Sequence, residues 1–146
     1  MSKEQNKAPI KTSMPPEFED DDDDSDLNAR ELDMFRQRLI AERDRVRDRL
    51  QRHLSEAVGN VDQLPDEMDQ ASRETDQAYL LRLADKEKKL LGEIDRALAK
   101  FDRGSYGVCE GTGELITRKR LWLRPWTRYS IAHKERIERE KGRRLR

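Results

Sequence analysis

Apolar residues recur along the first half of the chain with the spacing of one helical face. From residue 32 they follow one another at intervals of three, four or seven: Leu32, Phe35, Leu39, Val46, Leu50 and Leu54. This spacing predicts an amphipathic helix of about 30 residues, roughly 45 Å long at a rise of 1.5 Å per residue. Asn28, followed three residues later by Glu31, is typical of a capping-box start, and Gly59-Asn60 is the predicted stop.

A second stripe of apolar residues follows after a short break. It consists of Leu80, Leu83, Leu90, Ile94, Leu98 and Phe101, widened by Leu91 and Ala97. This stripe predicts a helix from Pro65-Asp66 to Phe101 or Asp102. Two long helices with narrow apolar stripes bury them most simply by folding back on each other, so we expect a long antiparallel coiled-coil hairpin. Charged residues such as Glu87, Lys88 and Lys89 are expected on its solvent face.

Composition and charge divide the chain into three parts. Only 34% of residues are hydrophobic and 42% are charged, which excludes a thick globular core and suits exposed helices. Residues 1–28 carry three basic and nine acidic side chains, net −6. Residues 29–102 carry 15 basic and 17 acidic, net −2, and residues 103–146 carry 13 and five, net +8.

These shifts predict a mainly α protein with a simple domain order. Residues 1–27 are expected to form a disordered acidic tail, and residues 28–102 the hairpin, with an acidic tip near residues 61–71. Residues 103–146 are expected to form a small globular module with a basic C-terminal helix. The run Asp20–Asp24 is interpreted as a solvated tail, because sequential carboxylates in a flexible chain bind divalent ions weakly.

The segment after the hairpin has the layout of a small zinc module. Thiolates would be expected at four positions, which here read Cys109, Thr112, Ser130 and His133. Threonine and serine hydroxyls are poor zinc donors, and two remaining donors do not close a structural site. We therefore expect a degenerate zinc finger without tightly bound zinc. Apolar packing is expected to replace the metal, using Tyr106, Trp122, Trp126, Tyr129 and Ile131.

Several classes of protein are disfavoured by what the sequence lacks. No apolar run is long enough to span a bilayer, and no apolar segment after Met1 resembles a secretory signal. The single cysteine excludes an intramolecular disulfide and agrees with a reducing compartment. We expect a cytoplasmic protein without a membrane partner. His53 is interpreted as a surface or seam residue of the first helix.

The acidic tip has two interpretations. Asp66 and Asp69 are ordinary residues for a helix start, where carboxylates favour the positive end of the macrodipole. Alternatively, an acidic end on a long rod carries carboxylates into a channel too narrow for a globular domain. Periodicity and charge alone favour the structural interpretation.

A family resemblance changes that balance. The tip spacing Asp66-x-x-Asp69-x-Ala71, the hairpin, the block Arg120-Leu121-x-x-Arg124-Pro125 and the module Tyr106 to Lys134 together resemble the DksA/TraR family of bacterial RNA polymerase-binding regulators. The resemblance covers most of residues 28–141. It implies a non-enzymatic protein that inserts its coiled coil into the secondary channel of RNA polymerase. Asp66, Asp69 and Ala71 would then act near the active site of the polymerase.

The resemblance also implies a co-regulator. Family members act with the alarmone ppGpp in the stringent response, repressing ribosomal RNA promoters and activating some biosynthetic ones. Arg124 and Lys134 match basic residues that the family uses at its ppGpp site, whereas Glu93 stands where the well-studied members carry a lysine. No tightly bound cofactor is expected, and we expect a monomer.

Two other functions stay open at this stage. A Gre-like transcript-cleavage factor also uses an acidic hairpin tip, which helps the polymerase to hold a second Mg²⁺. A coiled-coil adaptor or nucleic-acid-binding protein would use the basic segment from Lys134 to Arg146. Direct DNA binding is the weaker alternative, because this segment alternates Arg with Glu as a solvated helix does.

Overall fold

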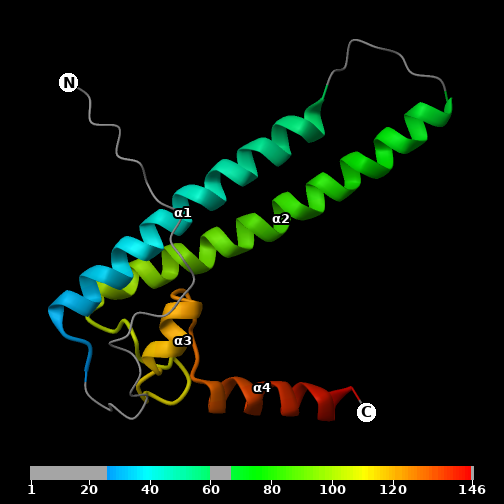
Figure 1. Cartoon of the computed structure of the whole chain (residues 1–146). Coiled ribbons are helices and arrows are strands. Elements are labelled where there is room, and N and C mark those ends of the chain that lie inside the picture. The colour runs from blue at the N-terminus through cyan, green and yellow to red at the C-terminus, as the bar shows by residue number, and fades with distance from the viewer. Residues whose placement is uncertain (1–25, 60–66, 146) are drawn as a thin grey trace, which may run out of the picture.

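Two long helices lie side by side in antiparallel orientation and form a rod with a small module at its base (Figure 1). The structure, a computed structural model, describes residues 26–59 and 67–145. The described helices are α1 (Ala29–Val58), α2 (Glu67–Arg103), α3 (Arg118–Leu123) and α4 (Ile131–Arg144). The expected mainly α architecture, with a hairpin, a module and a C-terminal helix, is confirmed. Most of the expected tail and residues 61–66 of the tip lie outside the described residues.

The ends of both long helices follow from local sequence. Asn28 caps α1 in a complete capping box: the Glu31 amide donates to Asn28 Oδ1 at 2.8 Å, and the Asn28 amide donates to Glu31 Oε1 at 3.2 Å. At the end of α2, Gly104 adopts a φ of 71°. The amides of Gly104 and Ser105 then reach the carbonyls of Phe101 and Lys100, at 3.3 and 3.0 Å, in a Schellman motif. The predicted end at Phe101 or Asp102 is therefore short by one or two residues.

The seam between α1 and α2 is apolar near the module and partly ionic farther out. Four residues of the two predicted stripes are almost fully buried in this seam: Phe35, Leu39, Val46 and Ile94. Glu87, expected on the solvent face, is instead only 9% exposed. The prediction was wrong because Glu87 faces His53 across the seam, with 2.9 Å between its Oε2 and His53 Nδ1, and also pairs with Arg49 at 3.7 Å.

At the end of the hairpin farther from the module, α2 extends beyond the end of α1. Gln77 Nε2 donates to the Ala57 carbonyl at 2.8 Å, next to the last residue of α1. From there α2 continues back toward Glu67 for ten more residues, roughly 15 Å of helix. Residues 69–76 are all exposed. We call residues 67–76 the α2 overhang.

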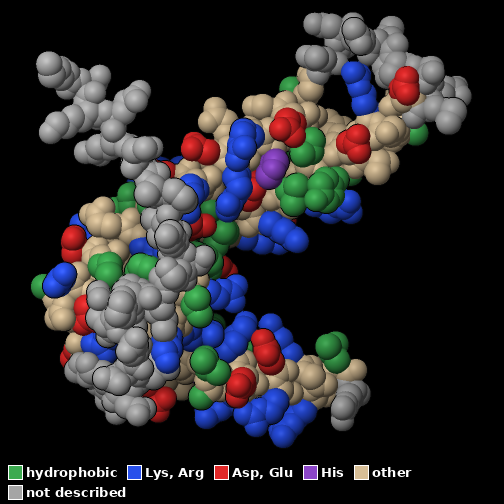
Figure 2. All heavy atoms as spheres, in the orientation of Figure 1, with side chains coloured by type: hydrophobic (Ala, Val, Ile, Leu, Met, Phe, Trp, Pro, Cys, Tyr) green, Lys and Arg blue, Asp and Glu red, His purple; other side chains and the backbone are tan. Residues whose placement is uncertain are grey.

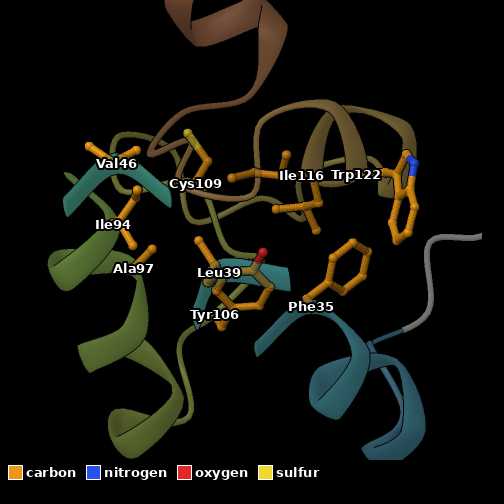
Figure 3. Packing of buried hydrophobic residues seen from close by; sticks show 10 residues of the cluster. Phe35, Leu39, Val46, Ile94, Ala97, Tyr106, Cys109, Ile116 and Trp122 are labelled. Carbon is orange, nitrogen blue, oxygen red and sulfur yellow. The ribbon is translucent and has the colours of Figure 1, made fainter. Parts of the chain in front are cut away.

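The module is joined to the base of the hairpin through one apolar cluster (Figure 3). The Phe35 ring lies 5.9 Å from that of Tyr106 and 6.3 Å from that of Trp122, while Tyr106 stacks on Phe101 at 4.1 Å. The Tyr106 hydroxyl donates to the carbonyl of buried Pro125 at 2.9 Å. This bond fixes the turn at Arg124–Thr127, which we call the Arg-Pro turn. The cluster therefore holds hairpin and module together as one body.

The rest of the module is irregular. Between α2 and α3 the backbone forms one antiparallel bridge, which joins Val108 and Leu115. An ion pair connects α3 to α1: Arg118 Nε lies 2.6 Å from Glu31 Oε2. α4 projects away from the module and buries none of its residues (Figure 1). Ile131, expected in the core, is 52% exposed because it opens this helix. None of the described helices has the length and apolarity needed to cross a membrane.

Candidate functional site

The two described residues of the predicted tip lie on the α2 overhang. Asp69 and Ala71 occupy its first turns and are both exposed. The Thr75 hydroxyl donates to the Ala71 carbonyl at 3.1 Å, an i−4 bond that weakens a helix slightly. Asp66, the third predicted residue, lies outside the described residues. The overhang thus presents a carboxylate and a small side chain at the end of a rod.

A basic cavity of about 200 Å³ lies at the opposite end of the molecule, between α2, the Arg-Pro turn and the start of α4. Both residues predicted to bind ppGpp, Arg124 and Lys134, line it. Glu93 lines it as well, so the three residues singled out from the sequence meet at one place. Its other lining residues are Arg120, Trp126, Thr127, Arg128 and Tyr129. Four cations against one carboxylate suit an anionic ligand.

Local structure positions these cations. Arg120 Nε donates to the Tyr129 carbonyl at 2.8 Å, which makes Arg120 part of the wall. Arg124 caps the end of α3, and its side chain is exposed. Lys134 sits in the first turn of α4, whose N-cap is Ser130. The positive end of this helix therefore adds to the positive charge at the cavity. Figure 2 shows Lys and Arg side chains gathered over α4.

A larger hollow of about 600 Å³ lies along α1 beside Asp48, Arg52 and Glu56. Its described lining residues are exposed side chains of α1 that carry both signs of charge. Such a surface does not enclose a ligand, so the smaller basic cavity is the better candidate site.

Sequence reasoning missed the ion cluster beside the cavity. Glu110 accepts from Arg128 Nε at 2.7 Å and pairs with Lys100 Nζ at 3.0 Å, and Lys100 is itself buried. Desolvation would raise the pKa of Glu110, but the bonds from Arg128 and Lys100 outweigh it and lower that pKa. Glu110 lies next to the only cysteine, which was the sole local signal that this position matters.

Two of the predicted ligand positions, Thr112 and Ser130, lie beside Cys109. Its buried sulfur receives hydrogen bonds from the Thr112 hydroxyl and from the backbone amides of Gly111, Thr112 and Ser130. Burial alone would raise the pKa of the thiol, but these donors together lower it from 9.0 to about 6. The surroundings of Cys109 therefore favour the ionised form of its side chain.

The donor set does not fit a closed zinc site. The Ser130 hydroxyl accepts from the His133 amide at 3.3 Å, as the N-cap of α4, and the Thr112 hydroxyl bonds to Cys109. The His133 imidazole lies so close over Gly111 that a Cβ there would stand 2.0 Å from its Nε2. Its Nδ1 is buried and has no hydrogen-bond partner among the described residues. One thiolate and one imidazole remain, two donors where structural zinc needs four.

Comparison with known proteins identifies the family. The RNA polymerase-binding transcription factor DksA of Caulobacter vibrioides is 37% identical over 123 residues, covering 84% of this chain and 87% of the relative. The chain belongs to the DksA/TraR family. The family model described as the DnaK suppressor protein DksA, N-terminal domain, matches residues 31–101, which include both stripes of the hairpin. The DksA of Escherichia coli K12 is 33% identical over 99 residues, covering 68% of this chain and 66% of the relative.

A solved structure supports the same assignment at the level of the fold. The structure of transcription factor DksA2 from Pseudomonas aeruginosa matches with a TM-score of 0.69 and 41% identity, covering 75% of this chain and 84% of that one. The match to the DksA N-terminal family model ends at residue 101, before the module begins.

Proposed function

We propose that this chain is a cytoplasmic, non-enzymatic transcription regulator that binds RNA polymerase and acts with ppGpp. The observation that carries the proposal is the α2 overhang: a member of this family presents exposed Asp69 and Ala71 at the end of a long, narrow rod. The relatives from Caulobacter and E. coli are named as RNA polymerase-binding transcription factors.

The rod is suited to the secondary channel of the polymerase. Two packed helices form a body far narrower than a globular domain, and α2 alone is roughly 55 Å long. Inserted tip first, it brings the Asp69 carboxylate close to the active site, where a negative charge alters the balance of promoter complexes. The module stays outside, at the rim of the channel.

The basic cavity is suited to the alarmone. A guanosine with two pyrophosphate groups carries several negative charges, which Arg and Lys side chains bind through charge-assisted hydrogen bonds. Arg124 and Lys134 supply such groups in the cavity between the module and α2. We infer that ppGpp binds here, deepening repression of ribosomal RNA promoters and supporting some biosynthetic ones. The protein works as a monomer and contacts no DNA directly.

Single-round transcription from a ribosomal RNA promoter tests the proposal. The full-length protein is titrated against purified polymerase with and without ppGpp, and inhibition that deepens with ppGpp is the expected result. Backtracked complexes treated with the same protein are expected to release no cleaved RNA. Cleavage would favour the Gre-like function, and no effect on either reaction would refute the proposal.

Arg124→Ala is expected to reduce the ppGpp response. Its side chain is exposed at the end of α3, so its removal leaves the fold in place while taking one cation from the cavity. We expect about a fivefold rise in the ppGpp concentration needed for half-maximal effect, the loss of one partly solvated charge-assisted bond. Arg139→Ala, on the exposed part of α4, is the matched control. Equal responses of the two variants would remove Arg124 from the site.

We further propose that the module folds without zinc and that the Cys109 thiolate takes part in its stability. Because the pKa of the folded state lies near 6, below the ordinary value of 9.0, the contribution is absent below pH 6 and grows as the pH rises toward 9. We expect Cys109→Ser to be tolerated, but to lose this increase in stability between pH 6 and 9. Melting temperatures with and without chelator check the prediction. A large fall of the wild-type value on adding chelator would contradict it.

A further inference from the structure

Arg128 occupies the wall of the basic cavity but matches no residue that the family resemblance singled out. It lies in the loop between the Arg-Pro turn and α4, and its side chain is 38% exposed, enough to meet a ligand. It brings a fourth cation to a cavity that also contains Glu93. Its place on this wall raises the question of what its charge does there.

Three contacts hold Arg128 in position. Its Nε donates to Glu110 Oε2 at 2.7 Å, its guanidinium lies 5.1 Å from the centre of the Tyr129 ring, and its carbonyl accepts from the Glu110 amide at 2.9 Å. Among the described residues, the hydrogen bond to Glu110 uses Nε alone. The two terminal amino groups of the fork are left for another acceptor, and a planar fork is the geometry that binds phosphate in a bidentate manner.

Glu110 has a second countercharge besides Arg128. Its other oxygen, Oε1, already pairs with Lys100 Nζ at 3.0 Å, and Lys100 is buried and has more to gain from the pair. Glu110 therefore keeps a partner when the Arg128 fork turns part of its hydrogen-bonding capacity to a ligand. The ion pair is better explained as a support that fixes the direction of the Arg128 side chain.

Glu93 places a negative charge where a polyphosphate would bind. It is exposed on α2, and its field reaches Arg128, whose pKa is raised first by the bond to Glu110 and to a smaller extent by Glu93. A carboxylate on the wall of an anion site repels the ligand unless a nearby cation offsets it. Arg128 lines the same wall and feels the charge of Glu93, so it is a cation that can provide this offset.

We propose that Arg128 is a phosphate-contacting residue of the ppGpp site and that it offsets the repulsion from Glu93. This inference rests on the proposed function and adds to it a specificity-determining residue. Arg128 both binds the ligand and permits Glu93 to remain in the wall. The effects of changing the two residues are therefore coupled.

A double-mutant cycle tests the coupling. The full-length protein, bound to polymerase, is titrated with ppGpp in single-round transcription for four forms: wild type, Arg128→Ala, Glu93→Gln and the double variant. We expect Arg128→Ala to raise the half-maximal ppGpp concentration about fivefold. The single variant Glu93→Gln, which retains Arg128, is expected to lower that concentration about twofold. In the Arg128→Ala background, Glu93→Gln is expected to lower it about fivefold, because the carboxylate there is no longer offset.

Two further variants separate binding from folding. Arg128→Lys keeps the charge but loses the fork, so its half-maximal concentration should lie between wild type and Arg128→Ala. Melting curves identify any variant that is simply unfolded, and a merely structural role would not make the effect of Glu93→Gln depend on residue 128. Arg139→Ala is again the matched control.

The outcomes distinguish this inference from the proposed function. Loss of the ppGpp response in Arg124→Ala, with Arg128→Ala equal to Arg139→Ala, overturns the role of Arg128 alone. Equal effects of Glu93→Gln in both backgrounds overturn the offset. The absence of any ppGpp response in the wild type removes the alarmone site itself, and with it this inference. The expected coupling, with Arg128→Lys intermediate, supports it.

Discussion

Asp69→Asn is expected to abolish most of the regulatory effect while leaving the protein folded and bound to polymerase. The side chain is exposed on the α2 overhang, and asparagine removes its charge while keeping its size. At a saturating concentration of the protein, we expect inhibition of a ribosomal RNA promoter to fall about tenfold. This is the change expected from losing one charge-assisted contact near the active site of the polymerase. Single-round transcription measures the loss, and competition with the unmodified protein measures binding to polymerase.

A matched control keeps this test specific to the tip. Asp76→Asn removes the same charge from the same exposed helix, seven residues farther from its start. It is expected to retain the inhibition of the wild type, and both variants should melt within a few degrees of it. Full inhibition by Asp69→Asn would remove Asp69 from the mechanism. An equal loss in both variants would mean that the overall charge of the helix, rather than this residue, matters.

Phe35→Ala is expected to have the largest effect on stability. The ring is fully buried where α1 meets the module and touches both Tyr106 and Trp122. Removing a buried phenylalanine ring leaves a cavity and costs about 3–5 kcal/mol. Because this cluster joins the hairpin to the module, the two parts should separate as the cluster fails. Urea denaturation followed by circular dichroism gives the free energy of unfolding.

Two variants bracket the effect of Phe35→Ala. Phe35→Leu keeps most of the apolar volume and should cost clearly less. Leu81→Ala removes a side chain from α2 that is 49% exposed and should change stability by about 0.5 kcal/mol or less. If Phe35→Ala cost no more than Leu81→Ala, the cluster would not be the core that joins the two parts.

The hairpin was predictable because its signals are local and repeated. Each stripe places an apolar residue on one face at every turn, and the start at Asn28 and the stop at Gly59 have their own chemistry. Glu87 was misplaced because periodicity assigns a face without showing what lies opposite. His53 and Arg49 come from the other helix, 34 and 38 positions earlier in the chain.

The module was less predictable because its contacts join distant segments. Of the predicted ligand positions Cys109, Thr112, Ser130 and His133, the structure places Thr112 and Ser130 beside Cys109, whereas the zinc-finger interpretation itself stays a prediction. The basic cavity, by contrast, is made of α2, the Arg-Pro turn and α4, and nothing in the sequence near Arg128 indicates Glu93. Ile131 was predicted to lie in the core because it is apolar. The sequence alone does not show that α4, which begins at Ile131, projects away from the module.

The α2 overhang has a consequence for affinity. Among the described residues no other helix runs beside residues 67–76 of α2, and short helices without tertiary packing are marginal in water. Only the fraction of molecules with an ordered overhang is ready to engage a target, so the apparent dissociation constant is the intrinsic one divided by that fraction. A segment that is helical one tenth of the time binds about tenfold more weakly than a preorganised one. Substitutions that change the helix content of these ten residues are therefore expected to change the apparent dissociation constant, even where they alter no residue that contacts the target.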